Sequence, residues 1–79
     1  MNIEQIKTQH VIATGHVNGQ QVQLIAKAGW HHLVRTATLH VKVAGKTQRI
    51  AQHYTAVRGD TIEQMREVGM RCCNLVTWQ

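Results

Sequence analysis

An Asn-Gly pair lies between two strand-like runs in the first third of the chain. Asn18 and Gly19 separate residues 10–17 from residues 20–27, and both runs are rich in Val, Ile and other residues typical of strands. Asn and Gly tolerate the positive φ that both central positions of a type I′ turn require, so this dipeptide is a strong hairpin signal. Pairing outward from the turn collects the apolar residues of both runs on one face. The chain is therefore predicted to contain an antiparallel β-hairpin here.

A second hairpin is predicted from residues 33–43 and 47–54. Apolar and polar side chains alternate along the first of these runs, as expected of a half-buried strand. Gly45-Lys46 suits a type II′ turn, whereas a turn at Ala44-Gly45 would shift the pairing and keep the same faces. The Gly45-Lys46 register pairs Val41 with Ile50, Lys42 with Arg49, Thr38 with His53 and Ala37 with Tyr54.

A helix is predicted over residues 61–76. Asp60 is suited to the N-cap position, and Glu63 three residues on completes a capping box. Gly69 interrupts the apolar side in mid-helix, where Gly costs about 1 kcal/mol relative to Ala and close approach to a strand is the ordinary reason for it. The apolar stripe consists of Ile62, Met65, Gly69, Cys72, Cys73 and Val76, which predicts that both cysteines pack as small hydrophobic residues.

These elements predict an α+β fold in a single domain spanning residues 1–79. Two consecutive hairpins form a four-stranded antiparallel sheet, residues 28–32 link them, and the C-terminal helix packs on one face. Residues 2–8 fit either a short helical turn or a frayed strand. Because a domain of 79 residues has a marginal core, a second subunit or a metal ion is a candidate additional support. One helix covers one face only, so the other face is left for water, a ligand or another subunit.

The cysteines and the lack of a targeting signal in the sequence indicate the cellular location expected for the chain. The two cysteines, Cys72 and Cys73, are adjacent and bridge each other only with strain, so reduced thiols and a cytoplasmic location are expected. No run of about 18 apolar residues suggests a membrane span, and the first ten residues lack the layout of a secretory signal. Gly-rich phosphate loops, paired carboxylates and nucleophile elbows are absent from the sequence, and no cofactor is predicted.

Positive charge is concentrated in the predicted sheet. The chain carries nine Lys/Arg and four Asp/Glu, for a net charge of +5. Residues 1–59 hold seven of the cations and one acid, for +6, whereas residues 60–79 hold two cations and three acids, for −1. Strand alternation places polar side chains on the face away from the helix: His10, His16, Gln21, Gln23, Lys27, Thr36, Thr38, His40, Lys42, Thr47, Arg49 and His53.

This face predicts a small non-enzymatic module that binds nucleic acid or another phosphate-bearing ligand, because clustered cations release counterions from phosphates. The absence of Phe, with Tyr54 on the helix side, favours backbone contacts over base stacking. The alternative without a ligand is a face whose polar residues only keep it solvated and prevent edge pairing. The residues predicted to contact the ligand are Lys27, Arg35, His40, Lys42, Lys46, Arg49 and His53.

A protein interface is the second functional hypothesis. The expected register pairs Ile12 with Ile25 on the otherwise polar face, and an exposed Ile pair is suited to a dimer contact. Trp30, in the predicted linker, is suited to closing the end of the sheet or to anchoring a partner. Under this hypothesis the chain is a homodimer, or a phage- or plasmid-type accessory protein that binds and inhibits or modulates a larger protein or nucleoprotein complex.

The six histidines support a third hypothesis, a metal-independent ribonuclease. His40 and His53 would act as base and acid, with Lys42 and Arg49 stabilising the phosphorane. Two histidines beside two cations are common on a sheet surface. His40 and His53 are therefore only weak candidates, and no catalytic residue is predicted. A zinc site needs about four ligands, and no metal ligand is predicted because the candidates lack a diagnostic spacing. Those candidates are one of His31 and His32, one of Cys72 and Cys73, and His10 or His53.

Overall fold

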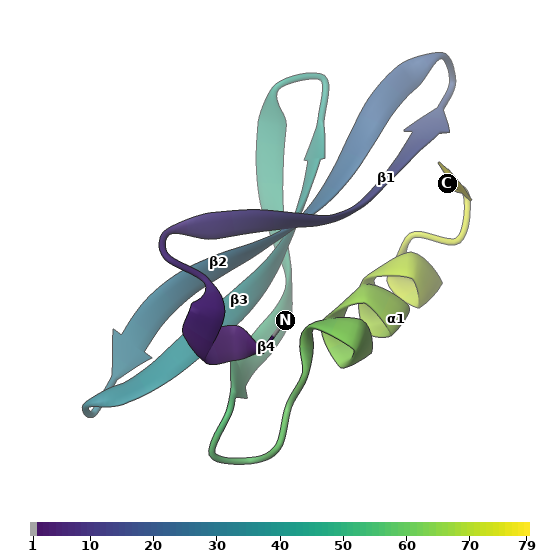
Figure 1. Cartoon of the computed structure of the whole chain (residues 1–79). Coiled ribbons are helices and arrows are strands. Elements are labelled where there is room, and N and C mark those ends of the chain that lie inside the picture. Colours follow the sequence, from purple (N-terminus) through teal and green to yellow (C-terminus); the bar gives the residue numbers. More distant parts are fainter. Residues whose placement is uncertain (1) are drawn as a thin grey trace.

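The chain folds into one antiparallel sheet with a single C-terminal helix against one face (Figure 1). The structure is a computed structural model that describes residues 2–79, without the side chains of Ala51 and Gln52. The fold is α+β, as predicted, and the sheet order is β4-β3-β2-β1-β5. Its elements are the 3-10 turn η1 (Ile3–Gln5), β1 (Gln9–Val17), β2 (Gln20–His31), β3 (Val34–Val43), β4 (Lys46–Thr55), α1 (Ile62–Cys72) and β5 (Thr77–Trp78).

The first hairpin forms at the predicted turn. Asn18 and Gly19 have φ of 51° and 77°, as a type I′ turn requires. The predicted register holds as far as Ala13 opposite Leu24, where a β-bulge intervenes. Beyond the bulge Val11 lies opposite Ile25, so the predicted Ile12–Ile25 pair is wrong. The inserted Ile12 packs against the core, which gives the extra residue its physical reason.

The predicted linker between the hairpins is also wrong, because residues 28–31 continue β2. A second tight turn, at His32 and Leu33, joins β2 directly to β3. Both residues have positive φ, 49° and 66°. No Gly or Asn marks this turn, so the sequence carried no standard signal for it. Trp30, expected outside the regular elements, instead lies in β2 opposite Arg35.

The second predicted hairpin turns at Ala44-Gly45, with φ of 52° and 81°, rather than at Gly45-Lys46. Lys42 therefore pairs with Thr47, not Arg49, and Arg49 pairs with His40. Between the pairs His40–Arg49 and Thr38–His53, β4 advances four residues while β3 advances two. This bulge restores the predicted register at the far end of the strand. The pairs observed there are Thr38–His53 and Ala37–Tyr54.

Helix α1 begins one residue later than predicted. Thr61 is the N-cap, and its hydroxyl accepts a hydrogen bond from the backbone N–H of Gln64 at 3.1 Å. The side chain of Gln64 completes the capping box by accepting from the Thr61 N–H. Asp60, the predicted cap, instead accepts from the backbone N–H of Thr55 and from Arg58. The carboxylate of Asp60 therefore ties the loop before the helix to the end of β4.

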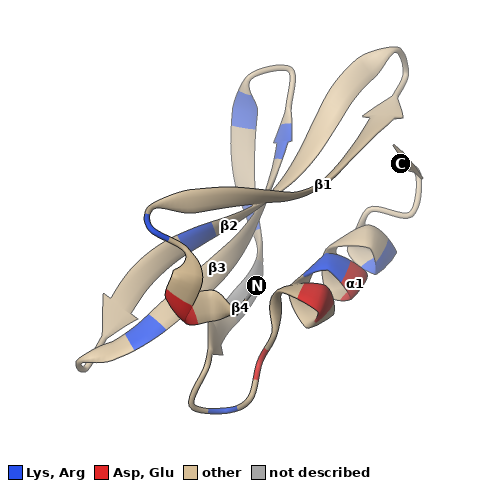
Figure 2. Cartoon of the chain, viewed as in Figure 1, with Lys and Arg blue, Asp and Glu red and all other residues tan. Residues whose placement is uncertain are grey.

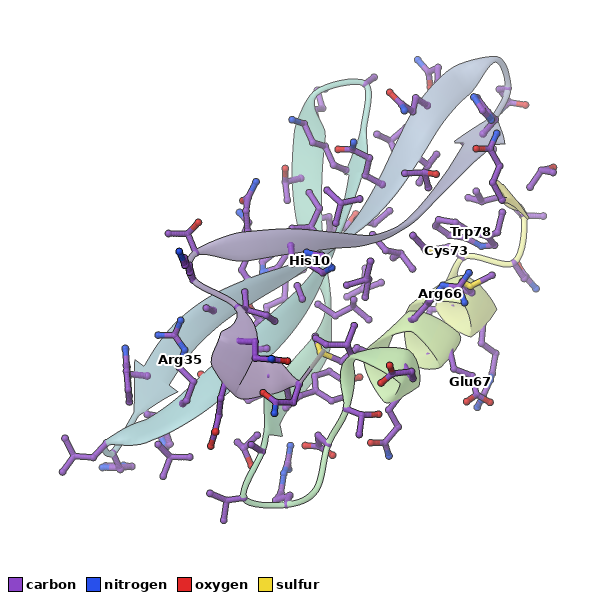
Figure 3. All side chains as sticks on the ribbon, viewed as in Figure 1. His10, Arg35, Arg66, Glu67, Cys73 and Trp78 are labelled. Carbon is purple, nitrogen blue, oxygen red and sulfur yellow. The ribbon has the colours of Figure 1, made fainter. Side chains whose placement is uncertain are left out.

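The helix ends at Cys72, four residues earlier than predicted. Cys72 is exposed and Cys73 is half-buried, so the prediction that both cysteines pack against the sheet is wrong for Cys72. The chain then turns back as β5, a fifth strand that pairs with Gly15 and His16 of β1. Trp78 in β5 packs against the core, and its indole N–H donates to the Cys73 carbonyl oxygen (Figure 3).

The core lies between α1 and the sheet. Leu24 and Leu39 of the sheet and Met65 of the helix are each 0% exposed. Gly69 allows this packing, because a Cβ there would lie 2.7 Å from a Leu24 methyl carbon. The close approach predicted for Gly69 is thus confirmed. The N-terminal segment adds Ile3 and Ile6, also fully or nearly fully buried, which the ambiguous pattern of residues 2–8 had left unassigned.

Within residues 2–79, none of the helices has the length and apolar character that crossing a membrane requires.

Candidate functional site

The face of the sheet opposite α1 presents its side chains in cross-strand rows. Directly opposed residues of an antiparallel pair point to the same side, and neighbouring strands lie about 4.8 Å apart. The sequence register therefore determines which cations are neighbours. Three successive rows are Gln9–Lys27–Thr38–His53, Val11–Ile25–His40–Arg49 and Thr14–Gln23–Lys42–Thr47. We call Lys27, His40, Lys42, Arg49 and His53 the basic face.

His40 lies at the centre of the basic face. Partial burial, followed by the nearby charges of Lys27 and Arg49, lowers the pKa of His40 below its usual value of 6.5. The imidazole Nε2 lies 2.9 Å from the Thr38 hydroxyl, which fixes the ring over its own strand. Burial is the larger cause of this lowering, and the charges of Lys27 and Arg49, from the two neighbouring strands, add to it.

The long strands of the sheet carry no acidic side chains. No Asp or Glu occurs between residues 5 and 59, so none of β1–β4 carries a carboxylate. The acidic residues lie on η1, on α1 and in the loop before α1, as Figure 2 shows. The two ion pairs recorded among the described residues, Arg58–Asp60 and Arg71–Glu67, are at these same places. The positive charge of the basic face is thus separated from the acidic part of the chain.

A polar groove adjoins the basic face at its Lys42 end. Its volume is about 490 Å³, and it lies between the β1–β2 and β3–β4 turns. Glutamine side chains line this groove beside the ammonium group of Lys42. The groove therefore offers amide hydrogen-bond donors together with one positive charge. The lining residues are Gln20, Gln21, Gln23, Lys42, Ala44 and Gly45.

Two of the predicted ligand-contacting residues lie on the helix-side face. Lys46 is opposite Val43 beside the β3–β4 turn. Arg35 donates hydrogen bonds to the carbonyl oxygens of Ile6 and Lys7 and lies 5.1 Å from the Trp30 ring centre (Figure 3). The guanidinium of Arg35 therefore joins η1 to the sheet, a structural role that residue spacing alone did not indicate.

Four residues expected on the open face either lie on the helix side or are buried. The β1 bulge puts His10 opposite Ala26, on the helix side. Thr36 is 2% exposed, and Ile25, predicted as an interface residue, is 3% exposed. Ile12, the other predicted interface residue of this pair, contacts the core instead. The bulge thus removes the exposed Ile pair on which a dimer contact at this face depended.

Three histidines, His31, His32 and His53, gather at one end of the sheet without forming a metal site among the described residues. The His31 ring lies 4.2 Å from the His32 ring and 6.1 Å from the His53 ring, between ring centres. Among residues 2–79, no group of three or more His, Cys, Asp or Glu side chains is arranged to hold a metal ion. His40 and His53 share a face on neighbouring strands. However, the recorded ring contact of His53 is with His31, whereas His40 is bonded to Thr38.

A groove at the β2–β3 end of the sheet was not predicted. It has a volume of about 420 Å³ and lies on the helix-side face beyond the reach of α1. Three of its apolar side chains are strongly exposed: Trp30 at 68%, Leu33 at 95% and Val57 at 79%. An apolar residue in a tight turn, Leu33, was the sequence signal that could have indicated this groove. The signal could be recognised only once the ends of β2 and β3 were known. The lining residues are Glu4, Trp30, Leu33, Val34, Arg35, Ala56 and Val57.

Comparisons with protein-family models, curated proteins and solved structures gave no match for this chain. The geometry of the two surfaces therefore carries the functional inference.

Proposed function

We propose that this protein is a non-enzymatic module that binds nucleic acid through the basic face. The observation that supports the proposal is the position of His40, whose pKa is lowered by burial and by the charges of Lys27 and Arg49. Charges brought close enough to affect a histidine produce a local potential that attracts phosphate groups. The energy gained on binding comes chiefly from counterion release by the polyanion.

The chemistry of the face favours contacts with the phosphate backbone over contacts with bases. Tyr54 pairs with Ala37 and Trp30 with Arg35, both on the helix-side face, and Trp78 lies in β5. No Trp, Tyr or Phe therefore contributes to the basic face, and base stacking has no platform there. Lysine, arginine, threonine and glutamine side chains supply charge and hydrogen-bond donors to phosphate oxygens. Binding is thus expected to depend weakly on base sequence and strongly on salt.

The test is fluorescence anisotropy with labelled duplex DNA, duplex RNA and single-stranded RNA at several salt concentrations. We expect log K to fall linearly with log salt, with a slope of about −0.9 per neutralised phosphate on duplex DNA. The double variant Lys42→Glu, Arg49→Glu should bind at least about tenfold more weakly and show a shallower slope, because phosphate contacts are lost. Comparison among the three nucleic acids identifies which one is preferred.

A matched double variant distinguishes the basic face from overall charge. Arg66→Glu, Arg71→Glu changes the net charge by the same amount on α1, where both residues are exposed. This variant should retain most of the affinity, since α1 lies on the other side of the sheet. Equal losses in the two double variants, or no binding by the unaltered protein at low salt, would contradict the proposal.

A further inference from the structure

The β2–β3 end of the helix-side face is apolar and bare. Figure 1 shows this hairpin extending away from α1, and η1 covers only part of it. Leu33 stands at the tip, 95% exposed, and the groove of about 420 Å³ beside it is lined by Trp30 and Val57. A protruding apolar side chain and an apolar hollow therefore occupy one patch of surface.

The backbone at Leu33 is unfavourable for a branched apolar residue. Its φ of 66° lies in the left-handed region, which leucine rarely adopts. The other two hairpin turns have Gly at the same position, Gly19 and Gly45, where positive φ carries no side-chain penalty. Leu33 thus combines a strained backbone with nearly full exposure of its side chain. Burying that side chain in a contact would offset both costs.

We propose that this tip is a two-fold contact between two copies of the chain. A two-fold contact uses the same patch on both partners, so the patch must complement itself. The tip meets this requirement in shape, because the Leu33 of each copy has a groove to enter on the other. The charged groups also match: one acid, Glu4, and one guanidinium, Arg35, line the groove. Two-fold pairing brings the acid of each copy to the guanidinium of the other.

Other partners fit this patch less well. A polyanion gains little from a groove that is mainly apolar and carries a carboxylate. An acidic peptide also meets the carboxylate of Glu4, which repels it. A second copy supplies an apolar knob and both charges at once. The contact leaves the basic face free, since that surface lies on the opposite side of the sheet, and the inference does not depend on nucleic-acid binding.

Sedimentation equilibrium on nucleic-acid-free protein tests the contact. The unaltered chain should sediment as a dimer at high micromolar concentration. Leu33→Asn should raise the dissociation constant about tenfold or more, because the buried apolar contact is lost. Asn is well tolerated at positive φ, so this variant is expected to fold at least as stably as the unaltered chain. Circular dichroism and thermal melting establish that it does.

Two further variants define the position of the contact. Leu75→Asn removes an 87% exposed leucine that does not line the groove, and the dimer should persist. Glu4→Lys places like charges together and should raise the dissociation constant several-fold. A monomer at every concentration of the unaltered chain would overturn the inference, and so would a dimer that Leu33→Asn leaves intact. The absence of nucleic-acid binding would not affect either result.

Discussion

The two faces of this sheet are built from alternate residues of the same strands, yet they differ in what surrounds them. On the helix-side face, Leu24 and Leu39 are fully buried under α1. On the basic face, His40 and Lys27 are partly exposed and Arg49 is exposed. The comparison teaches that stability and proposed binding are carried by different side chains of the same strands. Changes on one face should therefore have little effect on the property carried by the other.

The helix-side face is itself divided by the length of α1. Eleven helical residues extend about 16 Å at 1.5 Å per residue, whereas the molecule extends 40 Å along its longest axis. The helix therefore leaves the β2–β3 end of the sheet beyond its reach (Figure 1), and Trp30 and Leu33, which lie at that end, are strongly exposed. The same alternation of residues produces a core in one place and a bare patch in the other.

The largest effect on stability is expected from Leu24→Ala. Removing a fully buried leucine under α1 should lower the free energy of unfolding by about 2–5 kcal/mol, because a cavity remains. Urea denaturation measures the change. The control is Leu75→Ala, at an 87% exposed position, which should alter stability by less than about 0.5 kcal/mol. Similar losses at the two positions would contradict the division between buried and bare leucines.

Gly69→Ala should have the next largest effect. The new Cβ would lie 2.7 Å from one Leu24 methyl carbon, and Leu24 and Leu39 are both fully buried, so neither side chain has room to move. Overpacking costs about 1–3 kcal/mol, against about 1 kcal/mol gained from the better helix propensity of Ala. We expect a net loss of up to about 2 kcal/mol in the free energy of unfolding.

A double-mutant cycle identifies the cause of the Gly69→Ala loss. In Leu24→Ala, Gly69→Ala the added methyl group enters the space that Leu24 vacated. The double variant should therefore be more stable than the sum of the two single losses predicts. Additive losses would show that the contact between Gly69 and Leu24 is not the source of the strain.

The smallest effect, on the basic face, depends on pH and involves His40. The folded pKa of His40 is lowered below 6.5, so the unfolded chain binds this proton at higher pH than the folded chain. The resulting stability is fully present above pH 6.5 and is lost as the pH falls from 6.5 through the folded pKa. Relative to the unaltered chain, His40→Gln should therefore become more stable as the pH is lowered, as measured by urea denaturation between about pH 8 and 5. An unchanged difference between the two proteins across this range would contradict the placement of His40.

Lowering the pH should strengthen nucleic-acid binding, whereas it weakens the stability contributed by His40. Bound phosphates offset the charges of Lys27 and Arg49, which raises the pKa of His40 in the complex relative to the free protein. Proton uptake then strengthens binding as the pH falls. The strengthening should be smaller in His40→Gln, which retains the remaining histidines of the unaltered chain.

Local signals in the sequence determined the elements and their faces. Asn18-Gly19 located the first hairpin, alternation separated the two faces of the sheet, and the apolar stripe indicated the helix. The concentration of positive charge in the strands was also visible, because charge depends only on residue identity. These features were predictable because each depends on residues close together in the chain.

Only the tertiary structure decided the registers and the ends of the elements. The bulge in β1 turns Ile12 toward the core, and the turn at Ala44-Gly45 places Arg49 opposite His40. An inserted residue changes the local sequence pattern very little. The position of a bulge is therefore determined by side-chain packing in the core. The His32-Leu33 turn likewise lacks the usual residues, and pairing of the long strands on either side overrides that local preference. Distant contacts therefore decided which cations meet and which apolar side chains remain bare.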